Sequence, residues 1–206
     1  MVQILEFAVL VIVISASGVM APGPLFAANI SYGLREGTKS GVKMSIGHTI
    51  VELPLVVLLG IGVFSLETFP EFRIIISVFG AITLFVFAAL QIKTIFQKKE
   101  LIIPNQKQGP LFAGIILSVL NPFFIIWWLT IGFKLISDAM LIWAFSGILI
   151  VFALHIWMDF AWLGGISFLA SKRSRILSNR NYNILMIILS LMLVYFGITF
   201  LVDIIH

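Results

Sequence analysis

The chain has 206 residues, of which 61% are hydrophobic and only 11% are charged, and its net charge at pH 7 is +4. Soluble domains carry about 25% charged and about 45–50% apolar residues, so this composition excludes an ordinary soluble protein and indicates an integral membrane protein. The chain has no cysteine, which excludes disulfides and thiolate metal sites.

Long apolar runs predict six transmembrane helices, since a bilayer span needs about 20 largely apolar residues. These runs are residues 5–32, 42–65, 74–95, 111–133, 141–169 and 184–204. In lipid, only helices satisfy their backbone hydrogen bonds within one segment, and the runs lack the alternation of barrel strands. The expected fold class is therefore all-α. Residues 1–5 contain no Lys or Arg, so we expect the first helix to be retained rather than cleaved as a signal peptide.

Basic residues concentrate in alternate gaps between these runs. The gaps after the first, third and fifth runs hold eleven of the 13 Lys and Arg residues, and the opposite side holds two, Arg73 and Lys134. The eleven are Arg35, Lys39, Lys43, Lys93, Lys98, Lys99, Lys107, Lys172, Arg173, Arg175 and Arg180. The positive-inside rule then predicts a multi-pass protein of the cytoplasmic (inner) membrane with both termini outside. The net positive charge is therefore not evidence for a nucleic-acid partner, because the positive-inside rule accounts for the positions of the basic residues.

The chain divides into two related halves, residues 1–96 and residues 111–206, joined by a cytoplasmic linker at residues 97–110. Each half has a proline motif in its first helix and a His-x3-acid pair in its second helix. Because each half has three helices, the second half must enter the membrane from the opposite side. The repeat is therefore expected to be inverted, an architecture that many secondary transporters use.

The proline motifs are Pro22-Gly23-Pro24 in the first run and Asn121-Pro122 in the fourth. Proline removes an amide hydrogen and clashes with the preceding turn, and glycine adopts almost any backbone conformation. We expect the first helix to open here, so that the half-helix after Pro24 presents its positive N-terminal end to an anion. Asn121-Pro122 predicts a milder break. The alternative for each motif is a simple kink without a site.

Four ionisable residues lie well inside the apolar runs: His48, Glu52, His155 and Asp159. The i, i+4 spacing places each His beside its acid on one helical face. A charge at this depth costs about 2.5–3.5 kcal/mol, so it needs a partner, a cavity or a neutral form. We expect the two pairs to share one site that binds substrate or relays protons. The alternative is that each His only satisfies its own acid.

The glycine and proline spacing resembles the LysE family of amino-acid exporters. The residues that carry this resemblance are Ala21-Pro22-Gly23-Pro24, Gly33, Gly37, Gly41, Gly47, Asn121-Pro122, His155 and Asp159. The resemblance spans essentially the whole chain and implies proton-driven export of amino acids or similar small metabolites. Family members commonly carry a Lys directly after Asn-Pro, whereas this chain has Phe123. We therefore do not infer from the resemblance that lysine is the cargo of this protein.

Two functions follow from the polar residues. An amino-acid exporter would place the substrate carboxylate at the half-helix after Pro24 and its amine at Glu52 or Asp159, with the histidines relaying protons. The alternative is a divalent-metal transporter, because two His and two carboxylates suit Zn²⁺ or Mn²⁺. No enzyme and no cofactor are expected, since the chain has no zinc-protease, nucleophile-elbow or phosphate-loop motif. The sequence leaves a homo-oligomer open.

Overall fold

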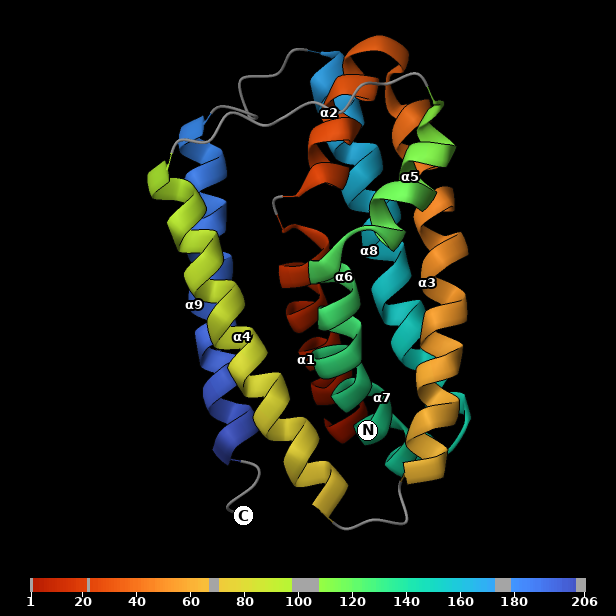
Figure 1. Cartoon of the computed structure of the whole chain (residues 1–206), viewed down its shortest axis with the longest axis vertical. Coiled ribbons are helices and arrows are strands. Elements are labelled where there is room, and N and C mark those ends of the chain that lie inside the picture. Colours follow the sequence, from red (N-terminus) through yellow and green to blue (C-terminus); the bar gives the residue numbers. More distant parts are fainter. Residues whose placement is uncertain (1, 22, 67–70, 98–107, 173–178, 203–206) are drawn as a thin grey trace.

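The computed structural model describes residues 2–21, 23–66, 71–97, 108–172 and 179–202, which form helices joined by short turns (Figure 1). The elements are α1 (Val2–Val19), α2 (Pro24–Glu36), α3 (Thr38–Leu66), α4 (Glu71–Gln97), α5 (Pro110–Val119), α6 (Pro122–Trp127), the π-helix η1 (Trp128–Gly132), α7 (Phe133–Trp143), α8 (Ser146–Ser171) and α9 (Asn179–Val202). The expected all-α class is confirmed for these residues.

Several of these helices are suited to a bilayer by length and composition. Within the described ranges, three are long and apolar enough to span it: Thr38–Val63, Pro122–Trp143 and Ser146–Ser171. The pair α1 and α2 adds a fourth if it counts as one span bent by 75°. Shorter apolar stretches occur in α4, α5 and α9, at Ser77–Leu90, Pro110–Val119 and Ser190–Val202. The chain is thus a multi-pass helical membrane protein.

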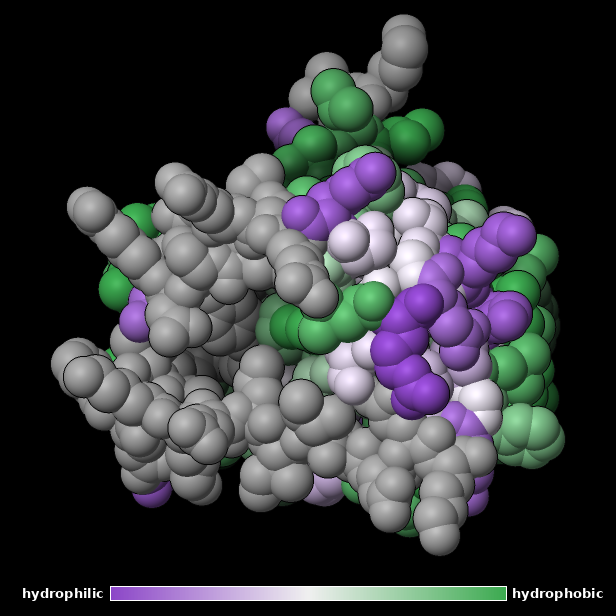
Figure 2. All heavy atoms as spheres, turned by 90° about the horizontal axis from the view of Figure 1, so that it is seen from above, coloured by the Kyte–Doolittle hydropathy of each residue, from purple (hydrophilic) through white to green (hydrophobic). Residues whose placement is uncertain are grey.

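Alternate connections lie at opposite ends of the molecule. In Figure 1, α1 begins and α9 ends at the lower end, where α7 also meets α8, whereas α2 meets α3 at the upper end. Seen from above in Figure 2, hydrophilic side chains gather over part of that upper end. The described charged residues in this region are Arg35, Glu36, Lys39, Lys43 and Lys172, and all are exposed. Basic side chains therefore lie at the end of the helices where the sequence predicts the cytoplasmic gaps.

Both proline motifs interrupt their helices, as predicted. The helix that begins at Val2 ends at Val19, and Gly23 has extended backbone angles (φ −155°, ψ −179°) before α2 begins at Pro24. Pro22 lies outside the described residues. In the second half, α5 ends at Val119, and the Asn121 side chain caps α6 by accepting a hydrogen bond of 3.1 Å from the Phe123 amide. Such caps satisfy the amides that a new helix end leaves unpaired.

The predicted boundary between the fourth and fifth spans is wrong. Residues 134–140 are helical and belong to α7, and the turn falls instead at Ala144 and Phe145. Lys134, which the sequence places in the gap, is buried and bonds Asp138 one turn later at 2.7 Å. An i, i+4 pair of opposite charge offsets the cost of burying Lys134, so the helix can continue through both residues.

Glycines bring α3 against its two neighbours. A Cβ atom added at Gly41 would lie 2.3 Å from the Leu163 carbonyl oxygen of α8, and one added at Gly47 would lie 2.1 Å from the Leu111 carbonyl oxygen of α5. These distances are shorter than any non-bonded contact, so only glycine permits this approach of the backbones. Because α3 carries His48 and Glu52, the close packing determines where both side chains lie.

Candidate functional site

The buried acid of the first half, Glu52, has partners on three helical segments. Its Oε1 atom lies 3.1 Å from Nε2 of His155 on α8 and 3.6 Å from Nε2 of His48 on its own helix. The indole Nε1 of Trp128, at the start of η1, donates a hydrogen bond of 3.1 Å to the same oxygen. Glu52 is 0% exposed. A carboxylate so buried is tolerable only because cationic or hydrogen-bonding groups surround it.

The second acid joins the same cluster. Asp159 Oδ1 lies 3.8 Å from His48 Nε2, and Asp159 Oδ2 lies 3.4 Å from His155 Nε2. Each histidine therefore faces the acid of the other half as well as its own. The alternative of two separate His–acid pairs is wrong, because the close approach of α3 and α8 merges the pairs into one group of four.

A hydroxyl links this cluster to the broken helix α5–α6. Ser118, near the end of α5, lies 2.6 Å from Nδ1 of His48, and its hydroxyl is also 2.6 Å from the Gly114 carbonyl oxygen. A hydroxyl has a single proton, so it donates either to the carbonyl or to the imidazole. When it donates to the carbonyl, His48 Nδ1 must carry a proton and donate to Ser118. The proton position on the His48 ring is thus coupled to the orientation of the Ser118 hydroxyl on α5.

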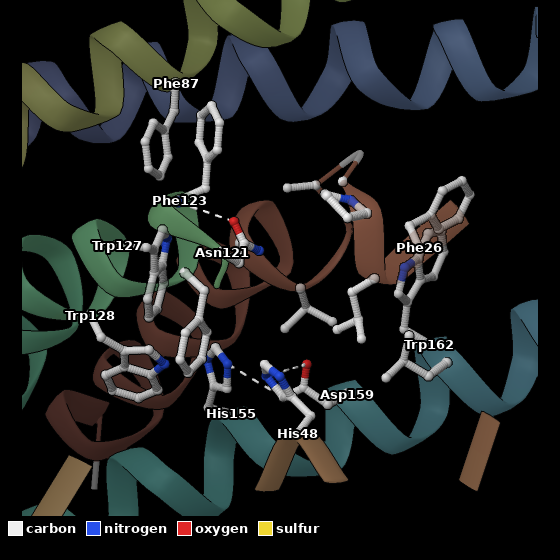
Figure 3. A pocket seen from close by; sticks show the side chains of 18 of the residues that line it. Phe26, His48, Phe87, Asn121, Phe123, Trp127, Trp128, His155, Asp159 and Trp162 are labelled. Carbon is white, nitrogen blue, oxygen red and sulfur yellow. Dashed lines mark hydrogen bonds and ion pairs between the residues drawn. The ribbon is translucent and has the colours of Figure 1, made fainter. Parts of the chain in front are cut away.

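A cavity of about 160 Å³ opens beside the four-residue cluster. Figure 3 shows His48, His155 and Asp159 along one side of it, with Asn121 across from them. Its volume is close to the roughly 150 Å³ of an engineered cavity that holds benzene. Polar groups that converge on one side of a mostly apolar pocket are typical of small-molecule sites.

Both helix breaks lie at this cavity. Gly23 and Pro24, where α2 begins, line it, and so does Asn121 at the break between α5 and α6. Pro122 is exposed and is not among the residues that line the cavity. Pro122 is the first residue of α6 and therefore contributes to the helix break, whereas Asn121 lines the cavity.

Two buried side-chain hydrogen bonds hold α2 in place next to the cavity. The Asn29 side-chain amide donates to the Leu163 carbonyl oxygen of α8 at 2.8 Å, and Ser167 donates to Asn29 Oδ1 at 2.7 Å. Asn29 and Ser167 are both 0% exposed. Buried hydrogen bonds of this kind fix the α2 half-helix relative to α8, which carries His155 and Asp159.

The sequence did not indicate three contributors to the site. Trp127 and Trp128 both line the cavity, and the Trp128 indole donates a hydrogen bond to Glu52. The third contributor is Ser118, whose hydroxyl contacts Nδ1 of His48. No spacing in the sequence relates these residues to the His-x3-acid pairs, because the contacts arise only after the fourth helix breaks at Asn121.

Half-helices that meet at a buried, charged cavity define a class of helical membrane transporters. A family model described as "LysE type translocator" matches residues 16–204. The chain belongs to this family. No curated protein and no solved structure matches the chain.

Proposed function

We propose that the protein is a secondary transporter that exports amino acids or similar small metabolites across the cytoplasmic membrane in exchange for protons. The observation that carries this proposal is the cavity between the cluster of Asp159 and two histidines and the beginning of α2. Membership of the LysE type translocator family supports a small-molecule cargo.

The two sides of the cavity suit the two charges of an amino acid. Asp159 offers a carboxylate to the ammonium group. On the other side, the first hydrogen bond of α2 runs from the Ala27 amide to the Gly23 carbonyl at 3.0 Å, so the Leu25 amide precedes the intrahelical ladder. The positive end of the α2 dipole and this amide favour a carboxylate.

The cluster also provides for exchange with protons. Two carboxylates are balanced when both imidazoles are protonated, and the loss of one proton leaves one uncompensated negative charge. An uncompensated charge inside a membrane is costly, so the ammonium of the cargo replaces the lost proton. Binding of cargo and of a proton therefore exclude each other, which is the condition for exchange.

We further propose that six spans form two inverted halves, residues 1–96 and 111–206, with the linker at residues 97–110 on the cytoplasmic side and both termini outside. The broken helices α1–α2 and α5–α6 occupy equivalent places in the two halves, as do the pairs on α3 and α8. The exposed basic residues at the upper end support the orientation.

Single cysteines test this orientation, and the native chain supplies a cysteine-free background. Gln106→Cys, in the linker outside the described residues, and Asn179→Cys, at the start of α9, should react with an impermeant thiol reagent only after the cells are permeabilised. Ser146→Cys, exposed at the opposite end, should react in intact cells. Labelling of Gln106→Cys or Asn179→Cys in intact cells would show that the proposed orientation is wrong.

Gly23→Val tests the transport function. A Cβ at Gly23 meets no atom within 4 Å, and valine adopts the extended angles of this residue, so the variant should fold. Its branched side chain would enter the cavity in front of α2. We expect proteoliposomes with Gly23→Val to lose at least about 90% of amino-acid exchange. A ten-fold lower rate corresponds to an activation barrier that is higher by about 1.4 kcal/mol.

The matched control is Gly165→Val, which also meets no atom within 4 Å but is exposed on α8 away from the cavity. It should transport at the unmodified rate. Equal transport by Gly23→Val and Gly165→Val would show that the first proline motif is only a kink in the helix and not part of a binding site.

The same assay should include Zn²⁺ and Mn²⁺, because donor atoms of His48, Glu52 and Asp159 lie within 4.8 Å of one another. Exchange of metal alone would contradict amino-acid export.

A further inference from the structure

The two acids of the cluster are not equivalent, although the sequence repeat pairs them. Asp159 lines the cavity, whereas Glu52 is not among its lining residues and is 0% exposed. Glu52 Oε1 already accepts the Trp128 indole and lies 3.1 Å from His155. Each acid keeps one buried oxygen that accepts no hydrogen bond from the described residues, Glu52 Oε2 and Asp159 Oδ2, but of the two side chains only that of Asp159 lines the cavity. Only Asp159 is placed to meet a cargo.

Aromatic side chains form much of the remaining cavity wall, beside aliphatic residues and Asn121. The Phe87 and Phe123 rings lie 5.1 Å apart on one side, and the Phe26 and Trp162 rings stack at 6.1 Å on another. Figure 3 shows these two pairs on different sides of the space above Asp159. Rings on several sides favour an apolar body that displaces water from the wall.

The charge of the wall restricts the cargo further. Among the described residues that line the cavity, Asp159 is the only acid and no Lys or Arg occurs. A cargo with one ammonium finds its counter-charge at Asp159. A second ammonium, carried on a side chain, would meet aromatic rings, aliphatic side chains and the Asn121 amide but no second carboxylate in the wall, and these groups compensate a desolvated cation less well than a carboxylate does. A side-chain carboxylate would likewise meet no Lys or Arg, and the two imidazoles in the wall already face Glu52 and Asp159.

We infer that the cavity selects amino acids whose side chain is uncharged and apolar, and that Asp159 binds their ammonium group while Glu52 positions the histidines. This inference rests on the proposed export function and specifies its cargo. The volume of about 160 Å³, close to that of an engineered cavity that holds benzene, favours a small apolar side chain, for which leucine and norleucine serve as probes.

Norleucine and lysine provide the decisive comparison, because lysine is norleucine with an ammonium group at the end of its side chain. Binding of each to the purified full-length protein should be measured by calorimetry in detergent, with leucine and glutamate as further probes. We expect norleucine and leucine to bind at least about ten-fold more tightly than lysine and glutamate. Asp159→Asn should weaken norleucine binding at least about ten-fold, and Asp159→Glu should restore part of it. The control Glu36→Gln, at an exposed pair with Lys43, should bind as the unmodified protein does.

A gain-of-function variant separates selectivity from folding. Phe123 lines the cavity, so Phe123→Glu places a second carboxylate in its wall. This variant should raise the affinity for lysine relative to norleucine by about ten-fold. Equal affinities for lysine and norleucine in the unmodified protein would overturn the cargo inference and leave amino-acid export standing. Binding of none of the four amino acids, with stabilisation by Mn²⁺ or Zn²⁺ alone, would overturn both.

Discussion

Glu52→Gln is expected to abolish coupled transport and to destabilise the folded protein. The substitution keeps the shape of the side chain but removes the charge that faces His155 at 3.1 Å and His48 at 3.6 Å. Removing one partner of a buried ion pair typically costs about 3–5 kcal/mol, because the other charge is left without compensation. Exchange in proteoliposomes and thermal unfolding in detergent measure the two effects.

Glu36→Gln is again the control, since this acid lies in an exposed pair that contributes at most about 1 kcal/mol. Asp159→Asn should differ from Glu52→Gln: it should lose cargo binding with a smaller loss of stability, because Asp159 lines the cavity, whereas Glu52 is fully buried and also accepts the Trp128 indole. Wild-type exchange by Glu52→Gln would contradict its role as the charge that positions the histidines. An equal loss of stability in both variants would contradict the non-equivalence of the two acids.

Gly47→Ala is expected to lower the free energy of unfolding by at least about 1–3 kcal/mol, the usual cost of overpacking a core. The added Cβ would lie 2.1 Å from the Leu111 carbonyl oxygen and 3.0 Å from the Ile115 amide nitrogen. Both are backbone atoms, which no side-chain rotation can move away, so α3 and α5 must separate. The separation would also pull Ser118 away from His48. Thermal unfolding and the monodisperse fraction after purification measure the effect.

Gly62→Ala on the same helix is the matched control, because its added Cβ would meet the Phe133 ring at an ordinary 3.6 Å. Its unfolding temperature should equal or slightly exceed that of the unmodified protein, since alanine has the higher helix propensity. Equal unfolding temperatures for Gly47→Ala and Gly62→Ala would show that the contact between α3 and α5 yields without cost.

Much of the site was predictable because its residues repeat. The i, i+4 pairs His48–Glu52 and His155–Asp159 predicted a shared site, and the structure brings all four side chains together. Local sequence also predicted both helix breaks, since the loss of amide hydrogens at proline acts within one turn. The end of the fourth helix was missed because a hydropathy pattern counts Lys134 as a charge and does not see its bond to Asp138.

By itself, the sequence determined the membrane environment, the positions of the breaks and the set of ionisable residues, because composition and proline chemistry act locally. Only the tertiary structure decided that Asp159 faces the cavity while Glu52 is enclosed by His155 and Trp128. The reason is that burial depends on which helix packs over each residue. The backbone contact between Gly47 and α5 depends on two helices that are far apart in the sequence. The position of Trp128 likewise depends on how the chain packs after the helix break, so neither could be predicted from one segment alone.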